Sequence, residues 1–416
     1  MPDTLHRRAF LEASAAGTAA LAFAPWVHAR GSDTLRLGLI GCGGRGTGAA
    51  ANCVESSPGI EVVAMGDLFA DRLRSSREQL AVLGEALRVS DETCFTGFDA
   101  YRGVLACEVD IVILATPPHF RPEHLRAAIE AGKHVFLEKP VAVDPVGVRT
   151  VIEASERARE TGLAIVAGTQ RRHQASYLET IERIQGGAIG ELLGGSCYWN
   201  QGGLWMHPRR PEWSDAEWQI RNWLYFTWLS GDHIVEQHVH NLDVMNWVFG
   251  GHPLRATGMG GREVRTDPAY GNVFDHFAVE YEYPGGRLVH SYCRQIDGCA
   301  TQVGERVIGS RGSADPAGTI LGARLWRFEG QEPNPYVQEH ADWIASIRAG
   351  RPLNEGRQVA ESTQTAILGR LSAYTGKSLE WEEASAADLR LGPPAYALGD
   401  LPIARVPVPG ATPLAR

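Results

Sequence analysis

The sequence has little of what marks several common classes of protein. Its seven cysteines are scattered, odd in number and without a CxxC pair, so neither a zinc site nor a disulfide framework is predicted. Positive charge is not in excess, because 49 Asp and Glu outnumber 40 Lys and Arg, whereas a nucleic-acid-binding protein normally carries the opposite balance. No apolar run is long enough for a stable membrane span. These absences argue against a nucleic-acid partner, a disulfide-stapled scaffold and a membrane-embedded chain.

What is present is an ordinary globular composition. Hydrophobic residues make up 44% of the chain and charged residues 21%, which excludes fibres and disordered chains. At 416 residues the chain is longer than one hydrophobic core usually organises. We therefore expect two domains.

The first thirty residues resemble an export signal. Arg7 and Arg8 precede a small-residue apolar run from 13 to 24, and residues 27–29 (Val-His-Ala) form a candidate cleavage site. A charged start, an apolar middle and a small-residue exit are typical of a signal peptide, and the paired arginines of the twin-arginine type. We expect residues 1–30 to be this signal and the protein to be periplasmic or exported. The alternative is an N-terminal amphipathic helix that packs on the body.

A glycine-rich turn follows a predicted buried strand at residues 34–40 and precedes an Ala-rich helical stretch at 47–54. Gly41 permits the tight turn, Gly43 lets the backbone approach a pyrophosphate, and Gly46 lets the helix pack against the strand. The N-terminus of the helix supplies free N–H groups for phosphates. The predicted cofactor-binding residues of this turn are Gly41, Gly43, Gly44, Arg45 and Gly46.

A second predicted strand, residues 61–67, ends in Asp67. Asp67 lies at the distance downstream where an acidic residue binds the ribose hydroxyls of a dinucleotide. Because a carboxylate at this point repels a 2′-phosphate, NAD is favoured over NADP. The alternative is that Asp67 caps the helix predicted at 68–79, and both roles can hold together.

Strands and helices continue to alternate along residues 34–170. The predicted strands are 109–115, 134–137 and 163–167, and the predicted helices are 122–131 and 145–160. This alternation predicts a doubly wound parallel sheet of the Rossmann type, with ligands at the carboxyl ends of its strands. Thr116, Pro117 and His119 follow one of these strands, and we expect them to contact the cofactor.

Five segments carry a resemblance to a known family. They are GLIGCGGRG at 38–46, ATPPHFRPEHLRAAIEAGKHVFLEKP at 115–140, HNLDVMNWVFGG at 240–251, GSRGSAD at 309–315 and PYVQEHADWIASIRAGRPLNEG at 335–356. Past its first thirty residues the chain resembles the Gfo/Idh/MocA family, which includes glucose–fructose oxidoreductase and inositol dehydrogenase. The resemblance implies an α/β fold with a second, α+β domain, here 171–390, built on a large, mainly antiparallel open-faced sheet. One face of that sheet covers the active site, and the other often joins a homo-oligomer.

The resemblance also implies a role for Glu138 and Lys139, which follow the strand at 134–137. Glu138 lies at the cofactor, and Lys139 contacts the reacting hydroxyl beside the nicotinamide. An ammonium there stabilises the negative charge that grows on oxygen as hydride leaves carbon. Taken alone, Glu-Lys-Pro is also a common surface turn.

A second group of polar residues lies at 231–243, for which we expect a helix. Glu236 and His240 are four apart and so face the same side. Family members often have Asp-x-x-x-His here, with the histidine as acid/base. His240 matches that histidine, whereas Glu236 replaces the aspartate, and both are predicted catalytic residues. A core histidine bonded to backbone is the alternative for His240. No metal site is expected from His233 and His238.

The remainder of the chain predicts the second domain and a terminal arm. Further predicted elements are helices 175–185, 335–349 and 359–374, a strand at 191–198, and a hairpin of 274–283 with 286–292. Six of the eleven tryptophans lie between 199 and 228, where they could line a sugar-binding cleft or simply pack. Residues 391–416, rich in Pro and Gly, are expected to form an extended arm.

These observations favour an exported NAD-dependent oxidoreductase that transfers hydride to or from a hydroxyl-bearing carbon of a sugar, polyol or glycoside. Since NAD is a cytoplasmic metabolite, an exported enzyme is expected to hold it tightly and to return each hydride to a second substrate. A redox-neutral, NAD-dependent glycosidase that works by transient oxidation is the first alternative. A non-catalytic NAD-binding sugar sensor is the second.

Overall fold

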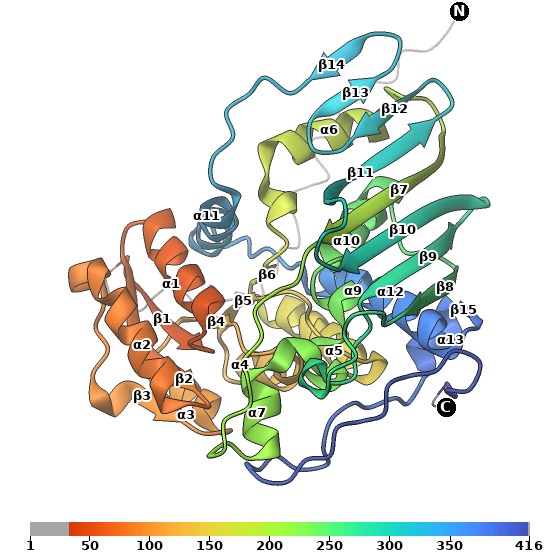
Figure 1. Ribbon diagram of the computed structural model, residues 1–416. Coiled ribbons are helices and arrows are strands. Elements are labelled where there is room, and N and C mark those ends of the chain that lie inside the picture. The colour runs from red at the N-terminus through yellow and green to blue at the C-terminus, as the bar shows by residue number, and fades with distance from the viewer. Residues whose placement is uncertain (1–32, 415–416) are drawn as a thin grey trace, which may run out of the picture. The chain divides into compact units, whose positions relative to one another are not determined.

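The computed structural model describes residues 33–414, so the predicted signal at 1–30 lies outside the described residues. Six parallel strands form the first sheet in the order β3-β2-β1-β4-β5-β6. Their bounds are β1 Leu35–Ile40, β2 Ile60–Asp67, β3 Cys94–Thr96, β4 Ile111–Leu114, β5 His134–Leu137 and β6 Ile165–Ala167. The doubly wound parallel sheet predicted from the sequence is confirmed (Figure 1).

Helices cover both faces of this sheet, which explains why its central strands are apolar throughout. All four residues of β4 are buried, as expected for a parallel strand with helices on either side. The helices that follow the strands are α1 Gly44–Ser56, α2 Ala70–Leu80, α3 Ala100–Ala106, α4 Arg121–Glu130 and α5 Pro145–Thr161. Helix α5 shows how local sequence sets these bounds. Asp144 caps it by accepting from the Gly147 N–H at 2.7 Å, and Gly162 ends it in the left-handed conformation.

One helix from the C-terminal part of the chain completes this first domain. Helix α11 (Pro335–Arg348) lies against α1, and its Trp343 and Ile344 are buried in the same apolar cluster as β1 and α1. The division of the sequence at residue 171 placed this helix in the second domain. Its packing shows that the first domain is built from two separate stretches of chain.

The second domain is built on a nine-stranded sheet in the order β14-β13-β12-β11-β7-β10-β9-β8-β15. All neighbouring strands are antiparallel except β7 and β10, so the mainly antiparallel sheet is confirmed. The bounds are β7 Leu192–Gln201, β8 Arg255–Gly261, β9 His276–Tyr283, β10 Arg287–Gln295, β11 Gln302–Gly309, β12 Gly312–Asp315, β13 Thr319–Leu321, β14 Leu325–Arg327 and β15 Ser378–Glu380. The predicted hairpin is the pair β9–β10.

Helices pack on one face of this sheet (Figure 1). The helices of the second domain are α6 Ala175–Gln185, α7 Asp215–Arg221, α8 Thr227–Ser230, α9 His233–Glu236, α10 Val239–Phe249, α12 Gly356–Thr375 and α13 Trp381–Ala386. Helix α12 contacts β8 and β9, and α10 contacts β7 and β11. Helix α12 also packs on α5 of the first domain, so it links the two cores.

The single helix expected over 231–243 is wrong, because the chain breaks between α9 and α10. In a continuous helix the Glu236 carbonyl would accept from the N–H of His240. Here that N–H is directed to the Gln237 carbonyl at 3.4 Å, and the Glu236 carbonyl accepts instead from Lys139 Nζ at 2.7 Å. A long-range contact with the lysine therefore replaces a local helical bond.

From residue 387 to the end of the described chain no helix or strand is found, in keeping with the expected extended arm. The arm (dark blue in Figure 1) is held by hydrogen bonds to both domains. The Leu391 N–H donates to the Asp144 carboxylate at 2.9 Å, and the Ala216 N–H donates to the Gly399 carbonyl at 3.0 Å. Residues 415–416 lie outside the described part.

Candidate active site

A cavity of about 550 Å³ lies at the carboxyl ends of the parallel strands. The first domain contributes residues that directly follow β1, β2, β4, β5 and β6. The second domain contributes residues from α9, from the break after it, from the start of α10 and from the segment 202–226. The predicted site residues that line the cavity are Gly41, Gly43, Gly44, Arg45, Asp67, Thr116, Pro117, Glu138, Lys139, Glu236 and His240. Ligand binding at this edge is typical of doubly wound sheets.

Glycine is required at two positions, one in the turn after β1 and one in the first turn of α1. Gly41 has φ +99, and a Cβ on it would lie 2.5 Å from the Thr116 backbone nitrogen. A Cβ on Gly46 would lie 1.9 Å from the Gly41 carbonyl oxygen. Gly46 does not line the cavity, so it acts by letting α1 pack closely on the turn.

At Gly44 a Cβ would meet nothing within 4 Å, because α1 begins there against open space. Gly43, Gly44 and Arg45 line the cavity, so the start of α1, where N–H groups lack helical partners, lies where a pyrophosphate would bind.

Asp67 ends β2 beside this turn. Its carboxylate accepts from the backbone N–H of Cys42 at 2.7 Å and of Phe69 at 2.9 Å. Burial raises the pKa of Asp67, while these bonds and the charge of Arg72 oppose the rise. Helix α2 begins at Ala70, and its N-cap residue is Phe69. Asp67 therefore precedes the N-cap and is not the residue that caps α2. The two halves of a dinucleotide site, phosphate and ribose, thus lie together, and NAD fits the groups present.

Lys139 and Glu236 form an ion pair between the two domains. The Lys139 ammonium donates to the Glu236 carbonyl at 2.7 Å and lies 3.3 Å from Glu236 Oε1. Both side chains are largely buried, with 12% and 10% of their surface exposed. The other carboxylate oxygen, Glu236 Oε2, is buried without a partner in the described chain. One oxygen therefore holds the lysine, and the other is available to a ligand in the cavity.

His240 lines the same cavity, and no described group hydrogen-bonds to its imidazole. Its ring stacks on that of Trp199, with centroids 5.7 Å apart. Burial lowers the pKa of His240 well below its usual value, and the charge of Lys139 lowers it further. The lowered pKa favours the neutral form of the imidazole. His240 is therefore not a core histidine whose ring is bonded to the backbone, which was the alternative.

His233 and His238 are engaged away from the cavity. His238 Nε2 lies 2.7 Å from Ser291 Oγ, and His233 Nδ1 lies 3.1 Å from the Asp232 carboxylate. Among residues 33–414 no group of three or more His, Cys, Asp and Glu side chains is arranged to hold a metal ion. Within the same residues no helix is long and apolar enough to cross a membrane.

Arg45 and Glu138 pair with each other on the wall of the cavity, and Arg45 also pairs with Glu339 of α11 at 3.2 Å. Burial raises the pKa of Glu339 well above its usual value, and the charge of Glu138 adds to the rise. The Tyr336 ring lies 5.0 Å from the guanidinium. Sequence reasoning missed Glu339 because only the fold brings α11 beside the glycine turn.

His119, expected at the cofactor, does not line the cavity. Its Nε2 is 2.8 Å from the Tyr396 hydroxyl, and its ring meets that of Trp228 edge to face. Burial lowers its pKa to about 4. The expectation is corrected for a physical reason: the C-terminal arm covers His119 through Tyr396, which the sequence around residue 119 could not reveal.

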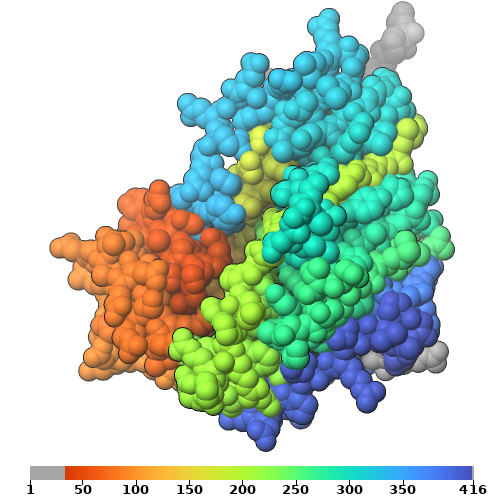
Figure 2. All heavy atoms as spheres, in the orientation of Figure 1, coloured from red at the N-terminus to blue at the C-terminus, as the bar shows by residue number. Residues whose placement is uncertain are grey.

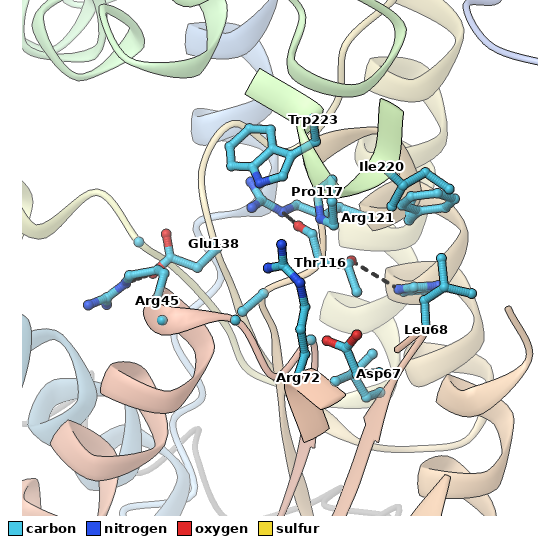
Figure 3. A pocket seen from close by; sticks show the side chains of 18 of the residues that line it. Arg45, Asp67, Leu68, Arg72, Thr116, Pro117, Arg121, Glu138, Ile220 and Trp223 are labelled. Atoms are coloured by element: carbon cyan, nitrogen blue, oxygen red, sulfur yellow. Dashed lines mark hydrogen bonds and ion pairs between the residues drawn. The ribbon is translucent and has the colours of Figure 1, made fainter. Parts of the chain in front are cut away.

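Several lining residues were not singled out from the sequence. Arg121 donates from Nε to the Thr116 carbonyl at 2.8 Å and from Nη1 to the Pro140 carbonyl at 2.6 Å, so it ties the ends of β4 and β5 together. In Figure 3, Trp223 and Ile220 of the second domain lie at the top of the view and Asp67 and Arg72 at the bottom. The tryptophan cluster was the one signal for this wall, through Trp205 and Trp223.

Comparison with known proteins agrees with this geometry. A family model described as "Oxidoreductase family, NAD-binding Rossmann fold" matches residues 35–168, and the GFO/IDH/MocA C-terminal domain matches residues 177–315. Inositol 2-dehydrogenase of Rubrobacter xylanophilus is 27% identical over 371 residues, covering 87% of this chain and 93% of that protein. The 2,7-anhydro-N-acetylneuraminate hydratase of Escherichia coli is 29% identical over 184 residues, 43% of this chain and 44% of that protein, so the match spans less than half of either.

Among solved structures, the aldose-aldose oxidoreductase of Caulobacter crescentus, complexed with glycerol, has the same fold. Its TM-score is 0.65 at 20% identity, with 83% of this chain and 99% of that chain covered. Two consecutive models of one family thus match the two domains described above. The chain belongs to the Gfo/Idh/MocA family of NAD-binding oxidoreductases.

Proposed function

We propose that this protein transfers a hydride between NAD and a hydroxyl-bearing carbon of an uncharged sugar or polyol. The observation that carries the proposal is the Lys139–Glu236 pair, which lies in one cavity with His240 and the glycine turn. An amine, an imidazole and an unpartnered carboxylate oxygen converge there from two domains. That set matches the needs of alcohol oxidation beside a nicotinamide.

Each group has a distinct task. When a hydroxyl is oxidised, hydride leaves carbon, the proton leaves oxygen and a carbonyl forms; bound NAD supplies the hydride acceptor. The Lys139 ammonium donates to the reacting oxygen and stabilises its growing negative charge. The neutral His240 imidazole accepts the proton. Glu236 Oε2 accepts from a neighbouring hydroxyl and so orients the substrate.

The charges of the cavity wall favour a neutral substrate. Lys139 is paired with Glu236, and Arg45 with Glu138 and Glu339. Arg121 is committed to two backbone carbonyls. A sugar acid that reached the free oxygen of Glu236 would place its carboxylate beside a second carboxylate, whose counter-charge is the single ammonium of Lys139. The relative from Rubrobacter is named for inositol, an uncharged polyol, which agrees with this choice.

Export and tight retention of NAD are part of the proposal. The paired arginines near the N-terminus support export. The segment 202–226 supports retention, because it lies over the cofactor side of the cavity (yellow-green against orange in Figure 2). Arg221 of this segment pairs with both oxygens of Asp71 at 3.0 Å, and Arg72 donates to the Arg221 carbonyl at 3.4 Å. A retained cofactor must be reoxidised in place by a second substrate.

The first experiment measures the cofactor directly. The purified full-length protein is expected to carry NAD, identified by mass spectrometry, and absorbance near 340 nm should rise when an uncharged polyol or aldose is added. The corresponding sugar acids should give a much smaller rise. If the loaded protein is reduced by no neutral sugar or polyol, the proposed reaction is wrong.

A redox-neutral reaction is the second candidate. The name of the Escherichia coli relative, a hydratase, describes a reaction without net oxidation. In that case the absorbance of the bound cofactor would change only transiently while a glycoside or anhydro sugar was consumed. The same absorbance assay, followed by product analysis, separates the two reactions and also a sensor that binds sugar without turnover.

We also propose that the protein is a homo-oligomer through the open face of the second sheet. The strand register places Met259, Ala278, Tyr292 and Tyr198 in one row across β8, β9, β10 and β7. Met259 is 74% exposed and Tyr292 39%, and the two tyrosine rings stack at 5.5 Å. Aromatic residues and methionine at the centre of a face, with charged residues around them, are typical of an interface.

Tyr292→Glu is therefore expected to weaken self-association by roughly 10- to 100-fold, since a buried charge replaces an aromatic contact. Light scattering coupled to gel filtration over a concentration series measures this change. Val82→Glu, at an 86% exposed position of the first domain, is the control and should leave the mass unchanged. Equal masses for both variants and the parent protein would contradict the interface.

A further inference from the structure

Asp232 has a backbone conformation that only glycine adopts readily. Its φ is 72° and its ψ is 162°. Among the residues that the structure describes, Asp232 is the only one other than glycine with a positive φ. Such residues persist only where the surroundings impose the conformation, and they gather at functional sites. Asp232 begins the turn of α9, because its carbonyl accepts from the N–H of Val235 at 3.0 Å and of Glu236 at 2.8 Å. Its backbone therefore sets the direction in which Glu236 leaves the turn.

The Asp232 carboxylate is fully buried and held by donors from three parts of the chain. One oxygen accepts from the His233 N–H at 2.6 Å, and the other from the Phe274 N–H at 2.8 Å and the Tyr374 hydroxyl at 2.6 Å. Burial alone would raise the pKa of Asp232, but the hydrogen bond and the charge of the His233 imidazole, and the bonds from Tyr374 and Phe274, lower it below its usual value. The carboxylate thus stays ionised, and its bonds hold the strained turn in place.

Arg370, one helical turn before Tyr374 on α12, joins this turn to the lysine segment. Its Nη1 donates to the Gly231 carbonyl at 2.9 Å and to the Val143 carbonyl at 2.8 Å, and the side chain is fully buried. Gly231 directly precedes Asp232, and Val143 lies four residues after Lys139. One guanidinium nitrogen therefore bonds both segments that supply the ion pair of the cavity.

We infer that Asp232, Arg370 and Tyr374 form a buried brace that positions Lys139 against Glu236. None of the three lines the cavity, so they are positioning residues that act through the backbone. The catalytic role of the brace rests on the proposed function, whereas its effect on the position of Lys139 does not. Since catalytic groups must be held within about half an ångström of their productive places, loosening the brace separates the pair.

The test compares two buried tyrosines. Tyr374→Phe removes the hydroxyl that bonds Asp232, while Tyr283→Phe removes an equally buried hydroxyl that donates to Asn246 at 2.7 Å, away from both segments. The readout is the rate at which trace acetic anhydride acetylates Lys139 in the purified full-length protein, relative to Lys377, followed by peptide mass spectrometry. This readout needs no substrate.

Tyr374→Phe is expected to raise the relative labelling of Lys139 roughly three- to ten-fold, the range of one hydrogen bond, and to lower kcat with the Kd for NAD unchanged. Tyr283→Phe should change neither. Equal labelling of Lys139 in the two variants overturns the brace. If Tyr374→Phe is insoluble, Asp232→Asn, which keeps the side-chain volume, is measured in its place with the same expectation. If the protein did not catalyse the proposed reaction, the labelling of Lys139 would still report on the brace. The proposed function and the brace can therefore be disproved separately.

Discussion

Replacing Lys139 by methionine is expected to lower kcat by roughly 10²- to 10³-fold, the usual effect of removing one donor to a developing oxyanion. Methionine keeps an unbranched side chain of similar length, so the cavity keeps its shape. The bound NAD should remain, because the glycine turn and Asp67 are untouched. The measurement is single-turnover reduction of the bound cofactor by the best polyol found in the absorbance assay.

Lys133→Met is the matched control. Lys133 precedes β5 and Lys139 follows it, so the two lysines lie at opposite ends of one short strand. Lys133 Nζ donates to the Val109 carbonyl at 2.8 Å, so its replacement also removes one charge and one hydrogen bond. Hydride transfer should be unchanged in that variant. A Lys139→Met protein that reduces its NAD at the parent rate would remove the mechanism proposed above.

The first domain was predictable because its signals are local. The buried strand before Gly41, the acidic residue that ends β2 and the Glu-Lys that follows β5 each depend on neighbours in the sequence. Parallel strands then bring their carboxyl ends to one edge, so the lysine and the glycine turn had to lie close together. Glu236 and His240 were predicted from the resemblance to the family's Asp-x-x-x-His pattern, and their spacing was taken to place them on one face of a helix, which is broken between them.

What could not be predicted depends on contacts between distant segments. At the break after Glu236, the carbonyl that helix continuation would use accepts instead from Lys139, 97 residues earlier. His119 was assigned to the cofactor from its place after β4, yet Tyr396, 277 residues later, covers it. Glu339 reaches Arg45 only because α11 returns to the first domain. Local sequence patterns do not indicate which distant segments come into contact. Hydrophobic periodicity, for example, predicts that a helix is amphipathic but not which surface it packs on.

A matched pair of glycine substitutions in α1 is expected to have opposite effects. In Gly46→Ala the new methyl would lie 1.9 Å from the Gly41 carbonyl oxygen, so α1 or the turn must shift away. Overpacking of this kind costs about 1–3 kcal/mol or more, because the nearest atom belongs to the backbone and cannot rotate aside as a side chain can. The shift moves the N–H groups at the start of α1 out of line with the phosphates. We therefore expect Gly46→Ala to unfold at a lower temperature and to bind NAD at least roughly 100-fold more weakly, by loss of several hydrogen bonds at once.

Gly48→Ala lies two residues further along the same helix, where a Cβ meets nothing within 4 Å. Alanine there restricts the unfolded chain and favours the helix, which should stabilise the protein by up to about 1 kcal/mol. Its NAD binding should equal that of the parent. Thermal unfolding and calorimetric titration of NAD into cofactor-stripped protein measure both quantities on the two variants. If Gly46→Ala binds NAD as tightly as Gly48→Ala, the close approach of α1 to the turn does not shape the phosphate site, and the cofactor must bind to other groups of the cavity.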